Sequence, residues 1–311
     1  AMRGRAVGVA LLATVPLAAA RIMPFDFLQP IYYRLEKRVA SGQIPRAVDE
    51  PNRLRLADCP LSEAPPAISH EKWSAVLRRH VITGGKVGTI TGINVVDYDG
   101  ISKDPDFDAY LAQLASVDVK NLQPAEALAL WMNAYNALCI NHIVRHLREK
   151  PGAPLDSILD LKKDGVVVWD LEAGVVGGKA RTLNEIEHEQ LRKRWDEPLV
   201  HACIVCASAS CPNLRTEAFE PPRLATQMEE QFADWMKNPT KGFKLEGPHR
   251  VLLSRIFLWF ADDFGGLDSS RSFVRDRGGL SGEAKSALTS SLTATRYFAY
   301  DWSMNRAPAK H

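Results

Sequence analysis

A long apolar segment in the middle of the chain constrains the fold more than any other feature of the sequence. It runs from Pro124 to Lys150 and reads PAEALALWMNAYNALCINHIVRHLREK, with proline at its first turn and Pro151-Gly152 directly after it, as is typical of helix ends. Its apolar residues fall on most sides of such a helix and not on one stripe, which is the pattern of a buried helix. We therefore predict a central helix over residues 124–150.

Shorter elements surround this helix in the sequence. Periodicity and turn residues predict further helices over 69–80, 104–115, 182–194 and 220–237, a hairpin within 86–97, a strand pair at 166–169 and 174–179, and a buried strand over 199–205. Two aromatic segments, 251–264 and 297–302, complete the pattern. The mixture predicts an α/β or α+β fold, in which residues 69–311 form a single mixed domain with the central apolar helix packed on a small sheet.

Residues 1–28 are basic at first and then apolar. Two arginines precede the uncharged run AVGVALLATVPLAAA at 6–20, an order typical of a secretory or lumen-directing signal. Crossing a bilayer takes about 20 apolar residues, and Pro16 interrupts this run, but the stretch 22–28 is apolar enough to lengthen it. Two interpretations therefore stay open, a cleaved export signal and a retained membrane anchor. Both predict an exported or lumenal protein.

Residues 29–68 form a proline-rich stretch. Its prolines block long regular elements, so we predict an extended arm. An arm without a core of its own, behind a membrane-directed segment, supports one possible role: a non-catalytic accessory subunit of a membrane protein complex, bound through both segments. Nucleic acid is not an expected partner, because 39 Lys and Arg against 37 Asp and Glu leave a net charge of only +2.

Four spaced clusters carry a resemblance to a known family. They are LWMNAYNAL at 130–138, LNEIEHEQLR at 183–192, HACIVCASASCP at 201–212, and Tyr300-Asp301-Trp302 with Asn305. In this order, over residues of about 105–305, the chain resembles the uncharacterised domain-of-unknown-function family 547. The resemblance implies the family fold and no activity, since the family's function is unknown. The chain departs from the family around an additional Cys203, where the family commonly shows a Phe and an Asn.

Cys211 is the first candidate for chemistry. It directly precedes Pro212, which favours a helical first turn, and a cysteine that caps such a turn gains thiolate character from the free N–H groups and the helix dipole. The alternative is a small, buried and inert residue. Cys206, five positions earlier, is a disulfide candidate with Cys211 across a short turn. The chain has 5 cysteines, an odd number, so at least one thiol stays unpaired within it.

Glu187 and His188 lie at the boundary of the apolar face of a short predicted helix. A histidine there serves either as the acid or base for a thiol or only as a cap for a loop carbonyl. His201, on the predicted strand, is either an enclosed residue or a second base. The two histidines and the two thiols Cys206 and Cys211 lack the spacing of a structural zinc site, so we predict no metal, and no motif indicates a cofactor.

The central helix carries polar residues at Asn133, Tyr135 and Asn136. The two asparagines share one face, and a buried amide that lacks partners costs about 1–3 kcal/mol. Either these amides tie the helix to loop backbone, or they stabilise an oxyanion or orient His188. The predicted site therefore contains Cys211, His188, Asn133, Asn136 and Glu187, with Cys206, His201 and Tyr135 nearby. It is typical of a thiol-dependent hydrolase, transferase or redox enzyme, and no feature names a substrate.

Overall fold

The computed structural model describes residues 53–59 and 66–308. The predicted signal or anchor and most of the predicted arm lie outside these residues. The described part of the arm lies against the domain, where the Leu54 N–H donates to the Arg194 carbonyl at 2.8 Å and Arg53 pairs with Asp196. Within the described ranges, no helix has the length and apolar character needed to cross a membrane.

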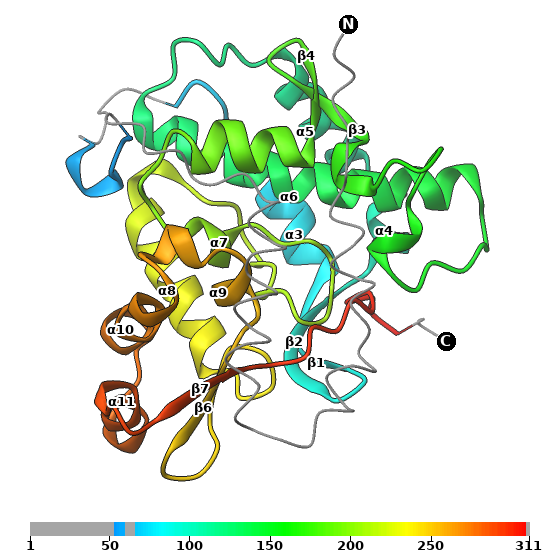
Figure 1. Cartoon of the computed structure of the whole chain (residues 1–311). Helices are drawn as coiled ribbons and strands as arrows, with labels where there is room; N and C mark the ends of the chain where they lie inside the picture. Colours follow the sequence, from blue (N-terminus) through cyan, green and yellow to red (C-terminus); the bar gives the residue numbers. More distant parts are fainter. Residues whose placement is uncertain (1–52, 60–65, 309–311) are drawn as a thin grey trace, which may run out of the picture.

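Helix α6 (Pro124–Glu149) lies at the centre of the fold (Figure 1). It begins with a capping box and has proline in its first turn. In the capping box, the Gln123 side chain accepts a hydrogen bond from the Glu126 backbone, and the Glu126 side chain accepts one from the Gln123 backbone. Every residue from Ala125 to Ile140 is buried. The predicted central helix is therefore confirmed, and its all-round burial follows from apolar residues on all of its sides.

The other elements are short. Before α6 come η3 (Leu56–Asp58), α3 (Glu71–His80), β1 (Val81–Val87), β2 (Ile90–Val96), α4 (Tyr98–Ile101) and α5 (Pro105–Ser116). After α6 come η4 (Ile158–Asp160), η5 (Val168–Asp170), β3 (Glu172–Val176), β4 (Lys179–Thr182), η6 (Glu185–Arg192) and α7 (Val200–Cys203). The C-terminal part holds η7 (Pro221–Arg223), α8 (Leu224–Lys237), β5 (Phe243–Leu245), β6 (Arg250–Leu253), α9 (Ile256–Trp259), η8 (Ala261–Phe264), α10 (Leu267–Arg277), α11 (Gly282–Thr289) and β7 (Ala294–Tyr297).

The described strands form three small sheets. β1 and β2 make one antiparallel hairpin, β3 and β4 make another, and the third sheet has the order β5-β6-β7, with β5 antiparallel and β7 parallel to β6. The β3 strand packs directly on α6: the Asn141 side chain donates to the Ala173 carbonyl at 2.8 Å, and a Cβ atom at position 174 would lie 2.5 Å from the Leu138 side chain. One large core joins most of these parts, and a second, small cluster of Ile90, Ile93, Val95 and Ala209 lies at the β1–β2 hairpin; the fold is a single α+β domain.

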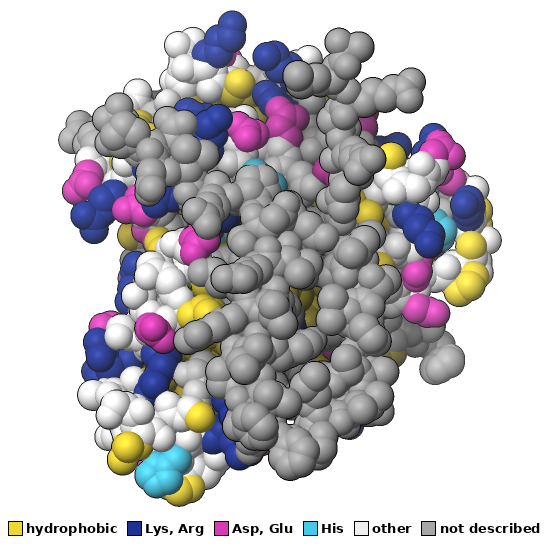
Figure 2. All heavy atoms as spheres, viewed as in Figure 1, with side chains coloured by type: hydrophobic (Ala, Val, Ile, Leu, Met, Phe, Trp, Pro, Cys, Tyr) yellow, Lys and Arg dark blue, Asp and Glu magenta, His cyan; other side chains and the backbone are white. Residues whose placement is uncertain are grey.

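Charged side chains of both signs cover the described surface. On the face shown in Figure 2, Lys and Arg alternate with Asp and Glu over the described residues. Several of these form surface pairs, such as Arg148 with Asp108 at 2.9 Å and Lys193 with Glu189 at 3.1 Å. Exposed pairs of this kind contribute little to stability, so the buried contacts around α6 decide the fold.

Four sequence predictions differ from the structure. The hairpin predicted within residues 86–97 begins earlier, since β1 starts at Val81 and the turn follows Val87. The predicted strand over 199–205 is wrong, because this segment forms the short helix α7 followed by extended chain; a short apolar run does not distinguish a buried strand from a buried helical turn. The predicted strand pair is displaced, since residues 168–170 form η5 and the hairpin is β3 with β4. The predicted helix over 182–194 is the π-helix η6, in which the Lys193 N–H donates to the His188 carbonyl at 3.1 Å.

The C-terminal segment crosses from β7 to the β1–β2 hairpin (Figure 1). On its way it pairs with the loop that holds Cys206 and Cys211. The Ala209 N–H donates to the Ser303 carbonyl at 2.8 Å, the Asn305 N–H donates to the Ala207 carbonyl at 3.0 Å, and the Asp301 N–H donates to the Ser210 hydroxyl at 2.8 Å. The segment therefore acts as a backbone clamp that holds this loop in one conformation.

The two asparagines of α6 tie the helix to loop backbone. Asn133 donates to the Phe219 carbonyl at 2.8 Å and accepts the Phe219 N–H at 2.9 Å. Asn136 donates to the Cys203 carbonyl at 2.9 Å and accepts the Val205 N–H at 2.9 Å. Both side chains are buried, and each amide uses its donor and its acceptor on main chain. They therefore set the path of the chain that leads into Cys206.

We expect the replacement Asn136→Leu to lower the free energy of unfolding by about 1–3 kcal/mol, because it leaves the Cys203 carbonyl and the Val205 N–H buried without that partner. Asn141→Leu is the matched control on the same helix, since the Asn141 side chain is half-buried and makes a single bond to β3. The decrease in the free energy of unfolding should be smaller for Asn141→Leu than for Asn136→Leu. Urea unfolding of the two variants measures the difference, and an equal or stabilising effect of Asn136→Leu would contradict the role given to this amide.

Candidate functional site

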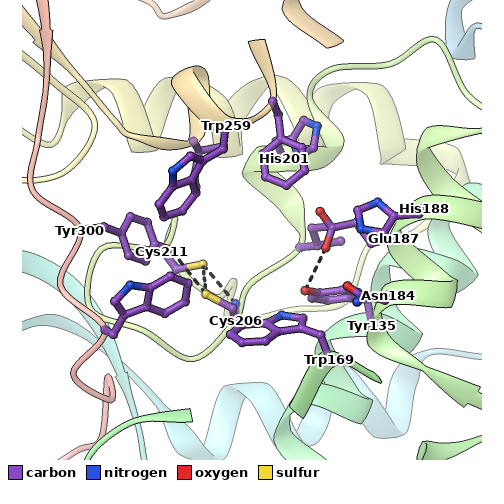
Figure 3. A pocket seen from close by; sticks show the side chains of 14 residues that line it. Tyr135, Trp169, Asn184, Glu187, His188, His201, Cys206, Cys211, Trp259 and Tyr300 are labelled. Atoms are coloured by element: carbon purple, nitrogen blue, oxygen red, sulfur yellow. Dashed lines mark hydrogen bonds between the residues drawn. The ribbon is translucent and has the colours of Figure 1, made fainter. Parts of the chain in front are cut away.

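A cavity of about 90 Å³ lies where α6, η6, α9, the Cys206–Cys211 loop and the C-terminal segment meet (Figure 3). Its lining combines thiols, a carboxyl group, histidines and aromatic rings. The residues are Tyr135, Trp169, Asn184, Glu187, His188, His201, Ile204, Cys206, Cys211, Ile256, Trp259, Phe260, Tyr300 and Trp302. Most of the predicted site residues thus come together at one place, although they are distributed over three segments of the sequence.

One side of the cavity is formed by the thiols of Cys206 and Cys211. Their sulfur atoms lie 3.1 Å apart, both as unpaired thiols. The Cys206 sulfur also lies 3.2 Å from the Ser208 hydroxyl and 3.4 Å from the Tyr300 hydroxyl, while the Cys211 sulfur accepts the Cys206 N–H at 3.1 Å. The predicted disulfide between these residues would need the two sulfurs to approach by about 1 Å. That bridge stays a prediction.

Negative charge is more stable on one of the two thiols than on the other. Hydrogen bonding from the Cys211 thiol, assisted by Ser208 and Tyr300, outweighs burial and lowers the pKa of Cys206 to about 6. Burial, together with the bond to Cys206, raises the pKa of Cys211. Cys206 is therefore the thiolate at neutral pH and Cys211 the thiol that donates to it. The thiol with the lowered pKa is therefore Cys206 and not Cys211, which the sequence named first.

The activation expected for Cys211 has no structural basis here. The residues directly after Pro212 form no helix, so the helix start expected there is not present. The loop instead derives its shape from Ala207, which has a left-handed backbone with φ of 60°. Such a conformation is rare for a residue with a Cβ atom, and it turns the chain sharply between the two cysteines. The C-terminal clamp holds this turn.

Lys241 supports the same loop from behind. Its ammonium group is buried and donates to the Cys211 carbonyl at 2.6 Å and to the Asn213 side-chain oxygen at 2.8 Å. Burial lowers the pKa of Lys241 to about 8, while the nearby thiols oppose that shift. A lysine surrounded by polar residues in a loop gives no signal in the sequence, and the prediction missed it.

The π-helix η6 forms the opposite side of the cavity. Its wide turns bring Glu187 and His188 to the cavity, as Figure 3 shows, and π-helical turns are found frequently at functional sites. The buried Glu187 carboxylate accepts a hydrogen bond from the Tyr135 hydroxyl at 3.3 Å. Burial raises the pKa of Glu187, although His201 and Arg192 oppose the shift.

A buried ion pair lies behind this side. Arg192 binds Asp263 through two bonds of 2.6 and 2.9 Å, and His201 binds the same carboxylate at 2.7 Å. Burial would raise the pKa of Asp263, but these bonds outweigh it and hold the pKa below its usual range. Arg192 also lies 2.9 Å from the His188 ring, and burial together with this cation lowers the pKa of His188 to about 3. His188 is therefore neutral at physiological pH and a weak base.

Aromatic rings complete the cavity beside the thiols. Trp259 and Trp302 stack with an interplanar angle of 19° and centroids 5.9 Å apart, and Trp169 meets Trp302 at 76°. Tyr300 lies between them, 4.8 Å from Trp259 and 4.6 Å from Trp302. The sequence analysis placed Trp259, Tyr300 and Trp302 only in aromatic segments and gave no sign that they surround a cavity.

Two predicted site residues lie elsewhere. Asn133 and Asn136 do not line the cavity, and their amides are used by backbone, so an oxyanion or histidine-orienting role has no geometric basis. Neither sulfur has a hydrogen bond to a histidine among the described residues, so no cysteine–histidine pair is formed. Over the same residues, no group of three or more His, Cys, Asp or Glu side chains has the arrangement of a metal site.

Fold and site together define an α+β domain with a two-thiol cavity. Residues 119–236 match the family model described as "Protein of unknown function, DUF547", so the chain carries a DUF547 domain. The match contains η6 and both cavity cysteines, and the Tyr300 to Asn305 cluster lies beyond it. Searches of curated proteins and of solved structures found no match to this chain.

We expect alkylation of Cys206 by iodoacetamide to rise with pH through a midpoint of about 6, well below the value of about 8.5 for an ordinary thiol. Because the folded state lowers this pKa, the thiolate stabilises the fold above the pKa of an ordinary thiol, and this contribution is lost as pH falls through about 6. Mass spectrometry of the labelled peptides gives the profile. Buried Cys139, whose pKa is raised by burial, is the internal reference and should stay unlabelled.

Tyr300→Phe removes one hydroxyl from the Cys206 sulfur and should move the alkylation midpoint of Cys206 to higher pH. Tyr110→Phe is a control for loss of a buried hydroxyl, since Tyr110 binds His70 away from the cavity. A midpoint near that of an ordinary thiol in the unsubstituted protein would overturn the assignment of Cys206 as the thiolate.

Proposed function

We propose that this domain is a thiol-dependent redox enzyme that exchanges the Cys206–Cys211 dithiol with the disulfide of a substrate bound in the cavity. The observation that carries the proposal is the 3.1 Å separation of two free sulfurs, both of which line the cavity. One sulfur has a pKa lowered to about 6 by the other. A thiolate beside a second thiol is the arrangement that attacks a disulfide and then resolves the mixed disulfide.

The geometry favours redox chemistry over hydrolysis or acyl transfer. A cysteine hydrolase needs a base in contact with its nucleophile and an orienting group for that base. Here the hydrogen-bond partners of the Cys206 sulfur are Cys211, Ser208 and Tyr300, and His188 has a pKa lowered to about 3. A second thiol in contact with the nucleophile takes no part in hydrolysis, whereas in exchange it resolves the mixed disulfide.

The exchange balances with these groups alone. The Cys206 thiolate attacks one sulfur of the substrate disulfide, and the first product leaves as a thiolate that takes the Cys211 proton. The Cys211 thiolate then attacks the Cys206 sulfur, the second product leaves and takes a proton from water, and a Cys206–Cys211 disulfide remains. The dithiol is oxidised by two electrons and the substrate disulfide is reduced by two. A thiol reductant restores the dithiol, and with an oxidised starting state the same steps run in reverse.

The predicted location agrees with this chemistry. The predicted export, with or without a retained membrane anchor, leads to an oxidising compartment. Protein disulfides form and persist in such compartments. The other proposed role, an accessory subunit held to a membrane complex by residues 1–28 and the arm, depends on segments outside the described residues. It needs no reactive thiol, so the reactivity of Cys206 separates the two.

Incubation of the reduced protein with bis(2-hydroxyethyl) disulfide should oxidise the pair, with loss of two hydrogens by intact-mass spectrometry. Cys211→Ser should instead accumulate a mixed disulfide at Cys206, because no resolving thiol remains. Cys206→Ser should react slowly, since the residual thiol has a raised pKa.

Cys139→Ser, on the buried face of α6, is the matched control and should behave as the unsubstituted protein. If Cys211→Ser forms no adduct while its circular dichroism is unchanged, the dithiol mechanism is wrong. Turnover of a thioester by Cys211→Ser at the full rate would point to acyl transfer in its place.

A further inference from the structure

We propose that the group bound in this cavity is a cation, an amine or quaternary ammonium, held between the aromatic rings of Trp169, Trp259, Tyr300 and Trp302 and the carboxylate of Glu187. The inference rests on the proposed function in taking this cavity as the place where the substrate binds. It adds the chemical class of that substrate, a disulfide whose end carries a positive charge.

The first argument is the arrangement of the rings. Trp169 meets Trp302 nearly edge-on at 76°, Tyr300 is tilted by 52° to Trp302, and Trp259 lies almost parallel to Trp302 at 19°. All four rings line the same cavity, and Figure 3 shows Trp169, Trp259 and Tyr300 around it. The negative faces of aromatic rings attract a cation most strongly where water is excluded, and such cages recognise quaternary ammonium groups. A flat neutral ligand would need only one pair of parallel faces.

The second argument is the charge of the lining. The acidic groups at the cavity are the Glu187 carboxyl and the Cys206 thiol, and no lysine or arginine is among the described residues that line it. Two cations lie next to the lining without belonging to it: Arg192 forms a two-bond pair with Asp263 and also contacts the rings of His188 and Phe260, and Lys241 binds loop carbonyl and amide oxygens. A ligand cation would therefore meet negative charge without competition from a side chain of the lining.

The third argument is the state of Glu187. Its side chain is buried, its pKa is raised by that burial, and the Tyr135 hydroxyl holds it in place. Burial disfavours the ionised form of a carboxyl group unless a cation lies beside it. A ligand cation would therefore restore the charge of Glu187. The cavity, at about 90 Å³, has room for a small head group such as an ammonium and its methyl groups.

The decisive test compares choline with 3,3-dimethylbutan-1-ol, which has the same shape and no charge. Both are titrated into Cys206→Ser/Cys211→Ser in phosphate buffer, with tryptophan fluorescence and calorimetry as readouts, so that no thiol chemistry takes part. We expect choline to bind roughly tenfold more tightly. Equal affinities would overturn the inference, because they mean that the rings bind shape and not charge, and so would absence of choline binding.

Glu187→Gln should reduce choline affinity roughly tenfold and leave that of the neutral alcohol unchanged. Glu189→Gln is the matched control two residues away on η6, where the side chain is exposed and pairs with Lys193. It should leave both affinities unchanged. A loss of choline affinity in Glu189→Gln equal to that in Glu187→Gln would place the effect in the general field of the protein and overturn the role of Glu187.

Exchange rates in the unsubstituted protein separate this inference from the proposed function. Cystamine, bis(2-hydroxyethyl) disulfide and 3,3′-dithiodipropionate are similar disulfides with positive, neutral and negative ends. Each rate is divided by the rate at which dithiothreitol reduces the same disulfide. On this scale cystamine should react fastest and the dianion slowest. Oxidation of the dithiol by all three at one relative rate would keep the redox function and remove the cation preference. Selective choline binding without oxidation by any of them would remove the redox function alone.

Discussion

The bonds between the Asn136 amide and the main chain of residues 203–205 are the contact on which the rest of the site depends. They join the most buried element of the fold to the segment that enters the cysteine loop, and they do so with two bonds of 2.9 Å in a fully buried position. Because neither backbone group has water as an alternative, the segment has one path and Cys206 one position. Asn133, one turn earlier on α6, holds the backbone of Phe219 in the same way.

The site also depends on backbone bonds between segments that are far apart in the sequence. The loop between the cysteines has a left-handed residue, Ala207, and such a turn persists only when its surroundings determine it. The C-terminal segment supplies that constraint through backbone bonds at Ala207, Ala209 and Ser210, and it brings Tyr300 to the Cys206 sulfur. One segment thus holds the loop and tunes the thiol, which explains why the Tyr300 to Asn305 cluster accompanies the cysteines in the sequence.

Charge in the cavity is arranged by burial and by hydrogen bonds. The bonds from Arg192 and His201 hold the pKa of Asp263 below its usual range, and burial together with the Arg192 cation keeps His188 neutral. The negative charge is thereby concentrated at Cys206, whose donors outweigh its burial, and at Glu187 when it ionises. These are the properties on which both proposals rest: a thiolate poised beside a second thiol, and an acidic cavity bounded by aromatic rings.

The sequence by itself determined the central helix, because its apolar pattern and its proline and glycine boundaries are local properties of residues 124–150. It also identified Cys206, Cys211, Glu187, His188, His201 and Tyr135, which share the cavity, from residue type and cluster spacing. Only the tertiary structure decided that the pKa is lowered at Cys206 and not at Cys211, that the amides of Asn133 and Asn136 bind backbone, that Trp169 and Trp259 line the cavity, and that Lys241 binds the cysteine loop. The reason is physical: burial, donor geometry and ring orientation arise between segments far apart in the chain, and no local pattern encodes them.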